Sequence, residues 1–208
     1  MGILKTIFNN TGKPQGLLGK MMVNSMNSGH AGVADWGIGF LDVSAPAFIA
    51  DLGCGGGCNA AKLMEKYPAA KLTALDHSDI SVEKTRQVNQ AAIHSGRCIV
   101  LQGDVSHMPF EDEAFDLVTA FETVYFWPGP EKSFREVCRV LKKGGTFLIV
   151  NESDGKNKAD EKWTGMIDGM TIYDAQQLTN ALKQAGFEKV DVYRNEGKHW
   201  LSLIAYKK

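Results

Sequence analysis

Long apolar runs are absent from this 208-residue sequence, and neither sign of charge is in excess. A membrane-spanning helix needs roughly 20 consecutive apolar residues, and the first residues lack the basic, apolar and small-residue segments of a signal peptide. We therefore expect a cytoplasmic protein without a membrane span. The formal net charge of -1 provides no overall field to attract nucleic acid or anionic lipid. A small molecule is the expected partner of a chain that is a monomer or a homodimer.

The 4 cysteines lack the paired Cys-x-x-Cys spacing that is typical of zinc sites. Cys54 and Cys58 are four residues apart, but neither a histidine nor a second cysteine pair stands nearby in the sequence to complete a ligand set. A chain of this length can bury a full core without disulfides. We therefore expect free thiols and no bound metal.

Apolar patterning from residue 47 onward alternates with helical periodicity, which indicates βαβ units and a parallel sheet. Strands are expected at 47–52, 71–76, 98–102, 115–121 and 146–151. Their nearly continuous apolar character suits strands that are covered on both faces. Helices are expected over about 57–67, 79–95 and 130–142, with Gly144 and Gly145 as the stop signal of the third.

The last part of the chain predicts a loop, a helix and a hairpin. Residues 152–169 are polar and lack periodicity, which favours a loop or lid. Apolar residues at the i, i+3, i+4 and i+7 positions from Leu178 then indicate a final helix that stops at Gly186. Segments 190–196 and 199–208 are expected to pair as an antiparallel hairpin at the edge of the sheet.

The most informative motif is ADLGCGGGC, residues 50–58, in which a strand leads directly into glycines and a helix follows. Gly53 and Gly55 carry no side chain, so the backbone can turn sharply and approach a ligand, while the helix offers free N–H groups at its N-terminus. This arrangement predicts a nucleotide-like ligand. A glycine-rich turn without a ligand is the alternative, because such a loop alone is a weak signal.

Two acidic residues strengthen the prediction of a nucleoside site. Asp76 ends the second strand, where its carboxylate can accept hydrogen bonds from both ribose hydroxyls. Asp104 follows the third strand, where it can accept from an adenine amino group while the N–H of Val105 donates to a ring nitrogen. In a doubly wound sheet, ligands bind outside the carboxyl ends of the strands. The glycine loop, Asp76 and Asp104 are all expected at that edge.

Together these segments resemble the class I S-adenosylmethionine-dependent methyltransferases, especially the type 11 group with the ubiquinone and menaquinone biosynthesis enzymes. The matching segments are ADLGCGGG, TALDHS, GDVSHMPFEDEAFD and EVCRVLKKGGTFLIVNE, and the similarity covers about 47–208. The resemblance implies a Rossmann-like, doubly wound α/β sheet of seven strands, mostly parallel with an antiparallel last strand and helices on both faces. It also implies methyl transfer from S-adenosyl-L-methionine to a small molecule, at an O, N, C or S atom that stays open.

The resemblance also implies a set of cofactor-binding residues, in which an acid before the glycine loop orients the methionine part. The expected set is Asp51, Gly53, Gly55, Asp76, His77, Asp104, Val105 and Phe121. Residues 47–208 would form the cofactor-binding domain. Residues 1–46, rich in glycine, asparagine and methionine, would form a cover of one or two short helices over the active site.

The catalytic candidates come from the expected cover and from the loop after the fourth strand. Methyl transfer from a sulfonium is an in-line displacement, so the protein mainly aligns the reactants and excludes water. A base is needed only for a protonated nucleophile. The candidates are His30, Glu122 and Tyr125, with Asp35 as a weaker one. The alternative for His30 is a solvated or structural role, as for most single histidines in turns.

Two other functions stay open at this point. A protein with the same fold could bind the cofactor as a sensor without turnover, although the long N-terminal segment suits the cover of a reactive site. An NAD-dependent dehydrogenase is a more remote alternative, because its GxGxxG loop would place Gly or Ala where this chain has Cys58. Nucleic-acid methylation is disfavoured, because no NPPY-like tetrapeptide follows the fourth strand to hold an extruded base.

Overall fold

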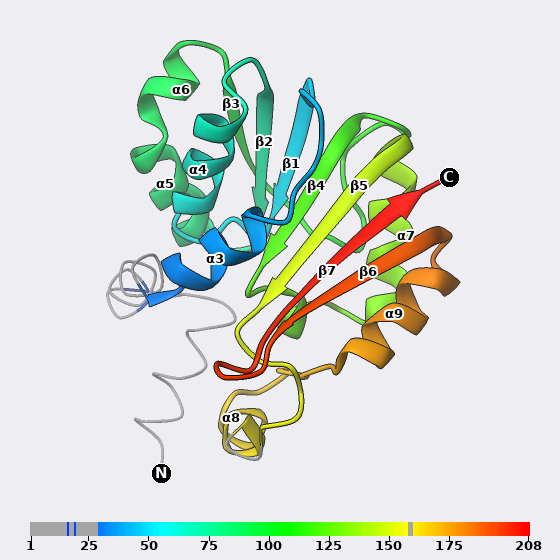
Figure 1. Ribbon diagram of the computed structural model, residues 1–208. Helices are drawn as coiled ribbons and strands as arrows, with labels where there is room; N and C mark the ends of the chain where they lie inside the picture. Colours follow the sequence, from blue (N-terminus) through cyan, green and yellow to red (C-terminus); the bar gives the residue numbers. More distant parts are fainter. Residues whose placement is uncertain (1–15, 17–18, 20–28, 158–159) are drawn as a thin grey trace.

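The computed structural model describes residues 16, 19, 29–157 and 160–208, which include a sheet flanked by helices on both faces (Figure 1). The sheet has seven strands in the order β3-β2-β1-β4-β5-β7-β6. The strands are β1 Phe48–Leu52, β2 Lys71–Asp76, β3 Cys98–Gln102, β4 Phe115–Phe121, β5 Leu141–Asn151, β6 Phe187–Asn195 and β7 Trp200–Lys207. Strands β1 to β5 pair in parallel, whereas β7 runs antiparallel to both of its neighbours. The predicted fold class and terminal hairpin are confirmed.

The strand order reverses at β1, which has β2 on one side and β4 on the other. A reversal of this kind leaves a crevice at the carboxyl ends of the strands. Asp51 in β1 lies beside Thr119 in β4 and Ala74 in β2. The loops that follow these three strands therefore meet at one edge of the sheet, the lower edge in Figure 1.

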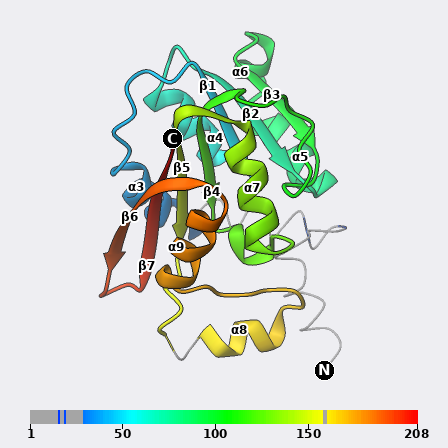
Figure 2. The ribbon, with the colours of Figure 1, turned by 90° about the vertical axis from the view of Figure 1, so that its right-hand side faces the viewer.

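Different sets of helices cover the two faces of the sheet (Figure 2). The helices are α3 Ala31–Ile38, α4 Cys58–Lys66, α5 Asp79–Val88, α6 Gln90–His94, α7 Pro130–Val140, α8 Glu161–Met166 and α9 Ala175–Gln184, and a 3-10 turn, η1, spans Val124–Phe126. Side chains of α3, α4 and α5 pack on one face, and those of α7 and α9 pack on the other. Among the described residues, no helix is long and apolar enough to cross a membrane.

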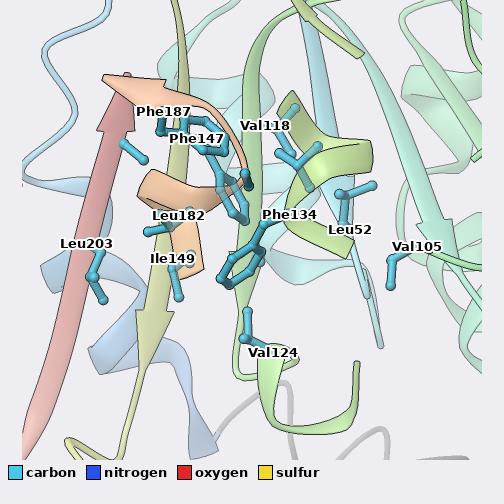
Figure 3. Packing of buried hydrophobic residues seen from close by; sticks show 14 of the residues in the cluster. Leu52, Val105, Val118, Val124, Phe134, Phe147, Ile149, Leu182, Phe187 and Leu203 are labelled. Carbon is cyan, nitrogen blue, oxygen red and sulfur yellow. The ribbon is translucent and has the colours of Figure 1, made fainter. Parts of the chain in front are cut away.

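Aromatic rings fill the space between the sheet and the helices α7 and α9 (Figure 3). Phe134 and Phe147 are fully buried, and their ring centroids lie 5.8 Å apart. Phe147 also contacts Phe187, at 6.0 Å, and stacks on Trp127 at 6.2 Å. Because Trp127 belongs to the loop after β4, this packing holds that loop at the carboxyl edge of the sheet.

The helix expected over 79–95 is two helices, α5 and α6, that meet at Asn89. The Nδ2 atom of Asn89 donates to the backbone oxygens of Gly57 and Thr85, both at 3.0 Å. A side chain that bonds backbone groups in this way competes with a continuous helix. The break therefore ties the C-terminal end of α5 to the glycine loop.

The expected stop signal at Gly144 and Gly145 was wrong, because both glycines lie inside β5. Helix α7 already ends at Val140, and the next residue, Leu141, pairs with Phe115 of β4. Residues 141 and 142, which the helical pattern included, therefore belong to β5. A side chain at Gly145 would lie 2.7 Å from the backbone oxygen of Lys142, so this bend in β5 requires glycine.

The two segments predicted to lie at the site edge each contain a short helix among their described residues. Within 152–169, α8 interrupts the expected loop. In the N-terminal segment, α3 packs on the sheet through Val33, Ala34 and Ile38. The remaining part of the expected cover, residues 1–15, 17–18 and 20–28, lies outside the described residues, so the division at residue 46 stays a prediction.

A Gly37→Ala substitution is expected to lower the free energy of unfolding by about 1–3 kcal/mol, the range for overpacking a close contact. A Cβ atom at Gly37 would lie 2.3 Å from Cγ2 of Val150 in β5. Thermal unfolding measures the effect. Gly165→Ala in α8 is the control, because nothing lies within 4 Å of that position. Equal melting temperatures for the two variants would contradict the close approach of α3 to the sheet.

Candidate active site

A cavity of ≈ 210 Å³ lies at the carboxyl edge of the sheet, where the loops after β1, β2, β3 and β4 meet. Its wall contains most of the expected cofactor set: Gly53, Gly55, Asp76, His77, Asp104, Val105 and Phe121. His30 and Glu122, two of the catalytic candidates, also line it. The structure thus brings together residues from the N-terminal segment and from four separate loops.

The glycine loop lines the cavity through Gly53, Cys54, Gly55 and Gly56. Gly53 and Gly55 adopt left-handed backbone conformations, with φ of 71° and 52°, which favour glycine. A Cβ atom on Gly53 would lie 2.0 Å from Oγ1 of Thr123, so the loop after β4 packs directly against the glycine backbone. The N–H groups of Gly53 and Cys54 both donate to the backbone oxygen of Leu75, at 2.7 and 3.1 Å. These bonds hold the turn in place.

Asp76 at the end of β2 connects the glycine loop to the next helix. Its Oδ2 atom accepts from the N–H of Gly55, and Oδ1 accepts from the N–H of Ser78, both at 2.9 Å. Burial raises the pKa of the Asp76 carboxyl, although these two hydrogen bonds oppose the shift. Each carboxylate oxygen has a second lone pair. The side chain is therefore fixed in orientation and can still accept from a ligand.

Asp104 and Val105 lie on the next loop, after β3. Asp104 is exposed, and its Oδ1 atom accepts from the N–H of Ser106 at 2.7 Å. This hydrogen bond lowers the pKa of the Asp104 carboxyl, so the residue is a charged acceptor. His77 stands between this loop and Asp76, with Nδ1 3.6 Å from Oδ1 of Asp76.

Asp51 lies behind the cavity wall rather than on it. Its side chain is buried in the sheet, where Oδ1 accepts from the Thr119 hydroxyl at 2.8 Å and Oδ2 has no hydrogen-bond partner. Burial raises the pKa of Asp51 to about 7, the Thr119 hydrogen bond opposes the shift, and the charge of Asp76 adds to it. The expected direct role of Asp51 toward a ligand stays a prediction.

Asp51→Asn is expected to stabilise the protein relative to the wild type as the pH rises. A carboxyl whose pKa is raised in the folded state binds its proton more tightly there than in the unfolded chain, so its contribution falls between about pH 4 and about pH 7. Asparagine keeps the acceptor for Thr119 and does not ionise. Melting temperatures across this range measure the effect, with the acidic end as the internal reference. A constant difference between the two proteins would contradict the raised pKa.

Three ionisable side chains from positions far apart in the chain converge here, and two of them, His30 and Glu122, line the cavity. Nε2 of His30 lies 3.4 Å from Oε2 of Glu152, and the N–H of Glu152 donates to Oε1 of Glu122. One ligand atom from each residue lies within 4.8 Å of the others. Glu122 has a left-handed backbone, with φ of 57°, which is uncommon outside glycine and turns the chain sharply after β4.

Burial and the mutual charges shift the pKa values of this cluster. Burial raises the pKa of the Glu122 carboxyl well above its usual value, and the charge of Glu152 adds to the shift. Burial lowers the pKa of His30, while Glu152 opposes the change. Glu152 is the solvent-facing member, with a side chain that is 53% exposed. The cluster therefore joins a buried carboxyl with a raised pKa, Glu122, to a second carboxyl that faces solvent, Glu152.

Residues 50–149 match the family model Methyltransf_11, the methyltransferase domain. This stretch is a methyltransferase domain. The chain is 31% identical over 161 residues to cycloartenol-C-24-methyltransferase 1 of Oryza sativa subsp. japonica, covering 72% of this chain and 46% of that protein. It is 32% identical over 161 residues to malonyl-[acyl-carrier protein] O-methyltransferase of Herminiimonas arsenicoxydans, covering 76% and 57%. The chain thus spans about half the length of the curated relatives that it matches.

The fold of the methyltransferase domain has close counterparts among solved structures. The partner chain of the Trm112 methyltransferase activator, in a complex from Haloferax volcanii, superimposes with a TM-score of 0.80 at 21% identity, covering 88% of this chain and 92% of that chain. At this level of identity the similarity concerns the fold alone. The family predicted from the sequence motifs is confirmed by the domain match.

The residues around the methyltransferase cavity fit S-adenosylmethionine in their chemistry. The Asp76 carboxylate offers acceptor positions suited to two ribose hydroxyls. Asp104 offers a charged acceptor suited to an adenine amino group. Gly53 and Gly55 place backbone without side chains at the cavity wall, where a nucleoside can approach closely. His77, Val105 and Phe121 complete this end of the wall.

Tyr125 does not line the cavity, contrary to the expectation that it faces the substrate. The ring is 4% exposed, and its hydroxyl accepts from the N–H of Ser153 at 3.1 Å. The 3-10 turn η1 directs the side chain into the protein, where it holds the segment after β5. Asp35, the weaker candidate, forms an ion pair with Lys62 that fastens α3 to α4.

Sequence reasoning missed or left unassigned several residues at the methyltransferase site. Thr123, Phe126 and Trp127 line the cavity beside Glu122. The Trp127 Nε1 atom donates to Thr123 Oγ1 at 3.2 Å, which orders this wall. Glu152 received no role, although it directly follows β5 and so belongs to the same carboxyl edge as Glu122. The rule that ligands bind at this edge could have identified it.

Proposed function

We propose that this protein is an S-adenosylmethionine-dependent methyltransferase that acts on a small molecule. The observation that carries the proposal is a single cavity whose wall combines two chemically different sets of residues. One set is the glycine loop with Asp76 and Asp104, and the other is His30 and Glu122. A nucleoside bound by the first set would present its methyl group toward the second.

The work of the protein in this reaction is alignment and exclusion of water. Asp76 and Asp104 would bind the ribose and adenine, and the glycine loop would support the methionine part together with Asp51 behind it. Glu122 and His30 would contact the acceptor. Residues 1–46 would form the cover, and α3, fastened to the sheet by the close contact between Gly37 and Val150, would place His30 over the cavity.

Small-molecule acceptors are favoured over nucleic acid. The formal net charge of -1 offers little attraction to a polyanion, and the relatives reported above are named for cycloartenol and for malonyl-[acyl-carrier protein]. A cytoplasmic location and a monomeric or homodimeric state remain predictions. A sensor that binds the cofactor without turnover remains the alternative.

Incubation of the full chain with methyl-labelled S-adenosylmethionine and a small-molecule cell extract tests the proposal. The expected result is a labelled product together with S-adenosylhomocysteine in catalytic excess over the protein. Tight cofactor binding without product from any extract would favour the sensor. A chain that binds neither S-adenosylmethionine nor S-adenosylhomocysteine would contradict both.

A further inference from the structure

The part of the cavity wall proposed to contact the acceptor carries carboxyl groups and no basic side chain. Among the described residues that line the cavity there is neither lysine nor arginine, and Glu122 is the acidic residue outside the set assigned to the nucleoside. Glu152 adds a second carboxylate next to Glu122 and His30. A carboxylate or phosphate acceptor would therefore lie against two carboxyl groups, with no lysine or arginine in the cavity wall to bind it, an arrangement that specific sites avoid.

Aromatic side chains stand beside these carboxylates. Phe126 and Trp127 line the cavity next to Glu122, and Trp127 is held in place by its hydrogen bond to Thr123 and by stacking on Phe147. The face of an aromatic ring attracts a cation electrostatically. Two carboxylates, an imidazole and two aromatic rings together make a site for a positively charged group.

We propose that the methyl acceptor is an amine, which binds as its ammonium ion among Glu122, Glu152 and His30 and loses a proton there. This inference rests on the proposed function, since it names the substrate class of the same cavity. Glu152, which the motifs left unassigned, becomes part of the acceptor site. The aromatic pair, Phe126 and Trp127, would hold the carbon atoms next to the nitrogen.

In the proposed reaction, one proton passes from the ammonium group to Glu122 and then to water. The Glu122 carboxylate takes a proton from the ammonium group, which leaves a lone pair on nitrogen. That lone pair forms the N–C bond to the transferred methyl while the C–S bond breaks and its electron pair stays on sulfur. The product is a methylated ammonium ion, and the proton on Glu122 leaves through the half-exposed Glu152 to water.

The electrostatics of Glu122 suit this task. Burial and Glu152 raise the pKa of the Glu122 carboxyl, so its conjugate base is stronger than an ordinary carboxylate. A general base works best when its pKa lies near the operating pH, and an upward shift moves a glutamate in that direction. An arriving ammonium ion would stabilise the ionised form of Glu122, because an opposite charge nearby favours a carboxylate.

A matched panel of acceptors tests the inference: benzylamine, benzyl alcohol and benzoate, and cyclohexylamine, cyclohexanol and cyclohexanecarboxylate. Each is incubated with the full chain and methyl-labelled S-adenosylmethionine, and products are identified by mass spectrometry. We expect labelled amines at about tenfold or more over the matched alcohols and carboxylates, as for one well-placed charged contact. Equal or greater labelling of an alcohol or carboxylate, or no labelled amine from a chain that binds S-adenosylhomocysteine, overturns the inference. A chain that fails to bind S-adenosylhomocysteine contradicts the proposed function instead.

Variants of Glu122 and Glu152 test the roles proposed for these two carboxyl groups. Glu122→Gln is expected to lower amine turnover by roughly 10², and Glu152→Gln is expected to raise KM for the amine more than it lowers kcat. Glu188→Gln, an exposed glutamate in β6 away from the cavity, is the control and should behave as the wild type. Wild-type turnover in folded Glu122→Gln overturns the base assignment. Activity that is abolished by EDTA and restored by Mg²⁺ would assign the three side chains to a metal ion and overturn the inference.

Discussion

A Gly53→Ala variant is expected to lose most of its affinity for S-adenosylmethionine, by about 10²-fold, because a displacement on the order of 1 Å in a binding loop is enough for such a loss. The added Cβ atom would lie 2.0 Å from Oγ1 and 2.6 Å from Cβ of Thr123. Either the glycine loop or the wall after β4 must move. Calorimetry with S-adenosylhomocysteine measures the loss.

The backbone conformation of Gly53 contributes a second, smaller effect, and a control separates the two. Gly129 has a similar φ of 77° but nothing within 4 Å of its Cβ position. Gly129→Ala therefore has the left-handed strain, about 1–2 kcal/mol, without the collision, and its cofactor affinity should stay near that of the wild type. The double variant Gly53→Ala/Thr123→Gly should recover part of the affinity. A folded Gly53→Ala protein with unchanged affinity would contradict the packing of the loop.

Asp76→Ala should weaken cofactor binding by about 1.5 to 3 kcal/mol, or roughly 10- to 150-fold. The truncation removes the charged acceptor that is assigned to the ribose hydroxyls. It also leaves the N–H groups of Gly55 and Ser78 without their acceptor, so a lower melting temperature is expected too. Titration calorimetry on the folded variant separates the two effects.

The control for Asp76→Ala is Asp79→Ala, three residues further on at the exposed start of α5. It removes the same side chain from outside the cavity wall, so its cofactor affinity should match that of the wild type. An unchanged dissociation constant for folded Asp76→Ala would remove the ribose assignment and leave the glycine loop as the main support for the nucleoside site.

Most of the cofactor end could be predicted because strand ends and loop glycines follow simple rules. Asp76 and Asp104 stand at or just after the ends of parallel strands, and parallel strands direct their carboxyl ends to the same edge. The structure brings both to one cavity. Asp51 is the exception. It precedes the glycine loop in the sequence, yet its side chain is buried against Thr119 of the neighbouring strand. Side chains alternate between the two faces of a strand, and the sequence pattern does not tell how deeply a side chain near the end of a strand is buried.

Helix boundaries were less predictable, since tertiary contacts decide them. The pattern over 79–95 is helical on both sides of Asn89, and only the hydrogen bond from Asn89 to Gly57 explains the break. Helix α7 ends where Leu141 begins to pair with β4, three residues before the glycines that a local rule would choose. In both cases a long-range bond overrides a local preference.

By itself, the sequence determined the doubly wound sheet and the positions of the glycine loop, Asp76 and Asp104 at its carboxyl edge, because apolar periodicity and strand-end positions act locally along the chain. Only the tertiary structure decided which groups form the cluster proposed to contact the acceptor. His30, Glu122 and Glu152 meet there from three distant segments, while Tyr125 turns inward. The reason is physical: a residue in a loop can face either side, and its direction depends on backbone angles such as the φ of 57° at Glu122 and on the partners that packing supplies.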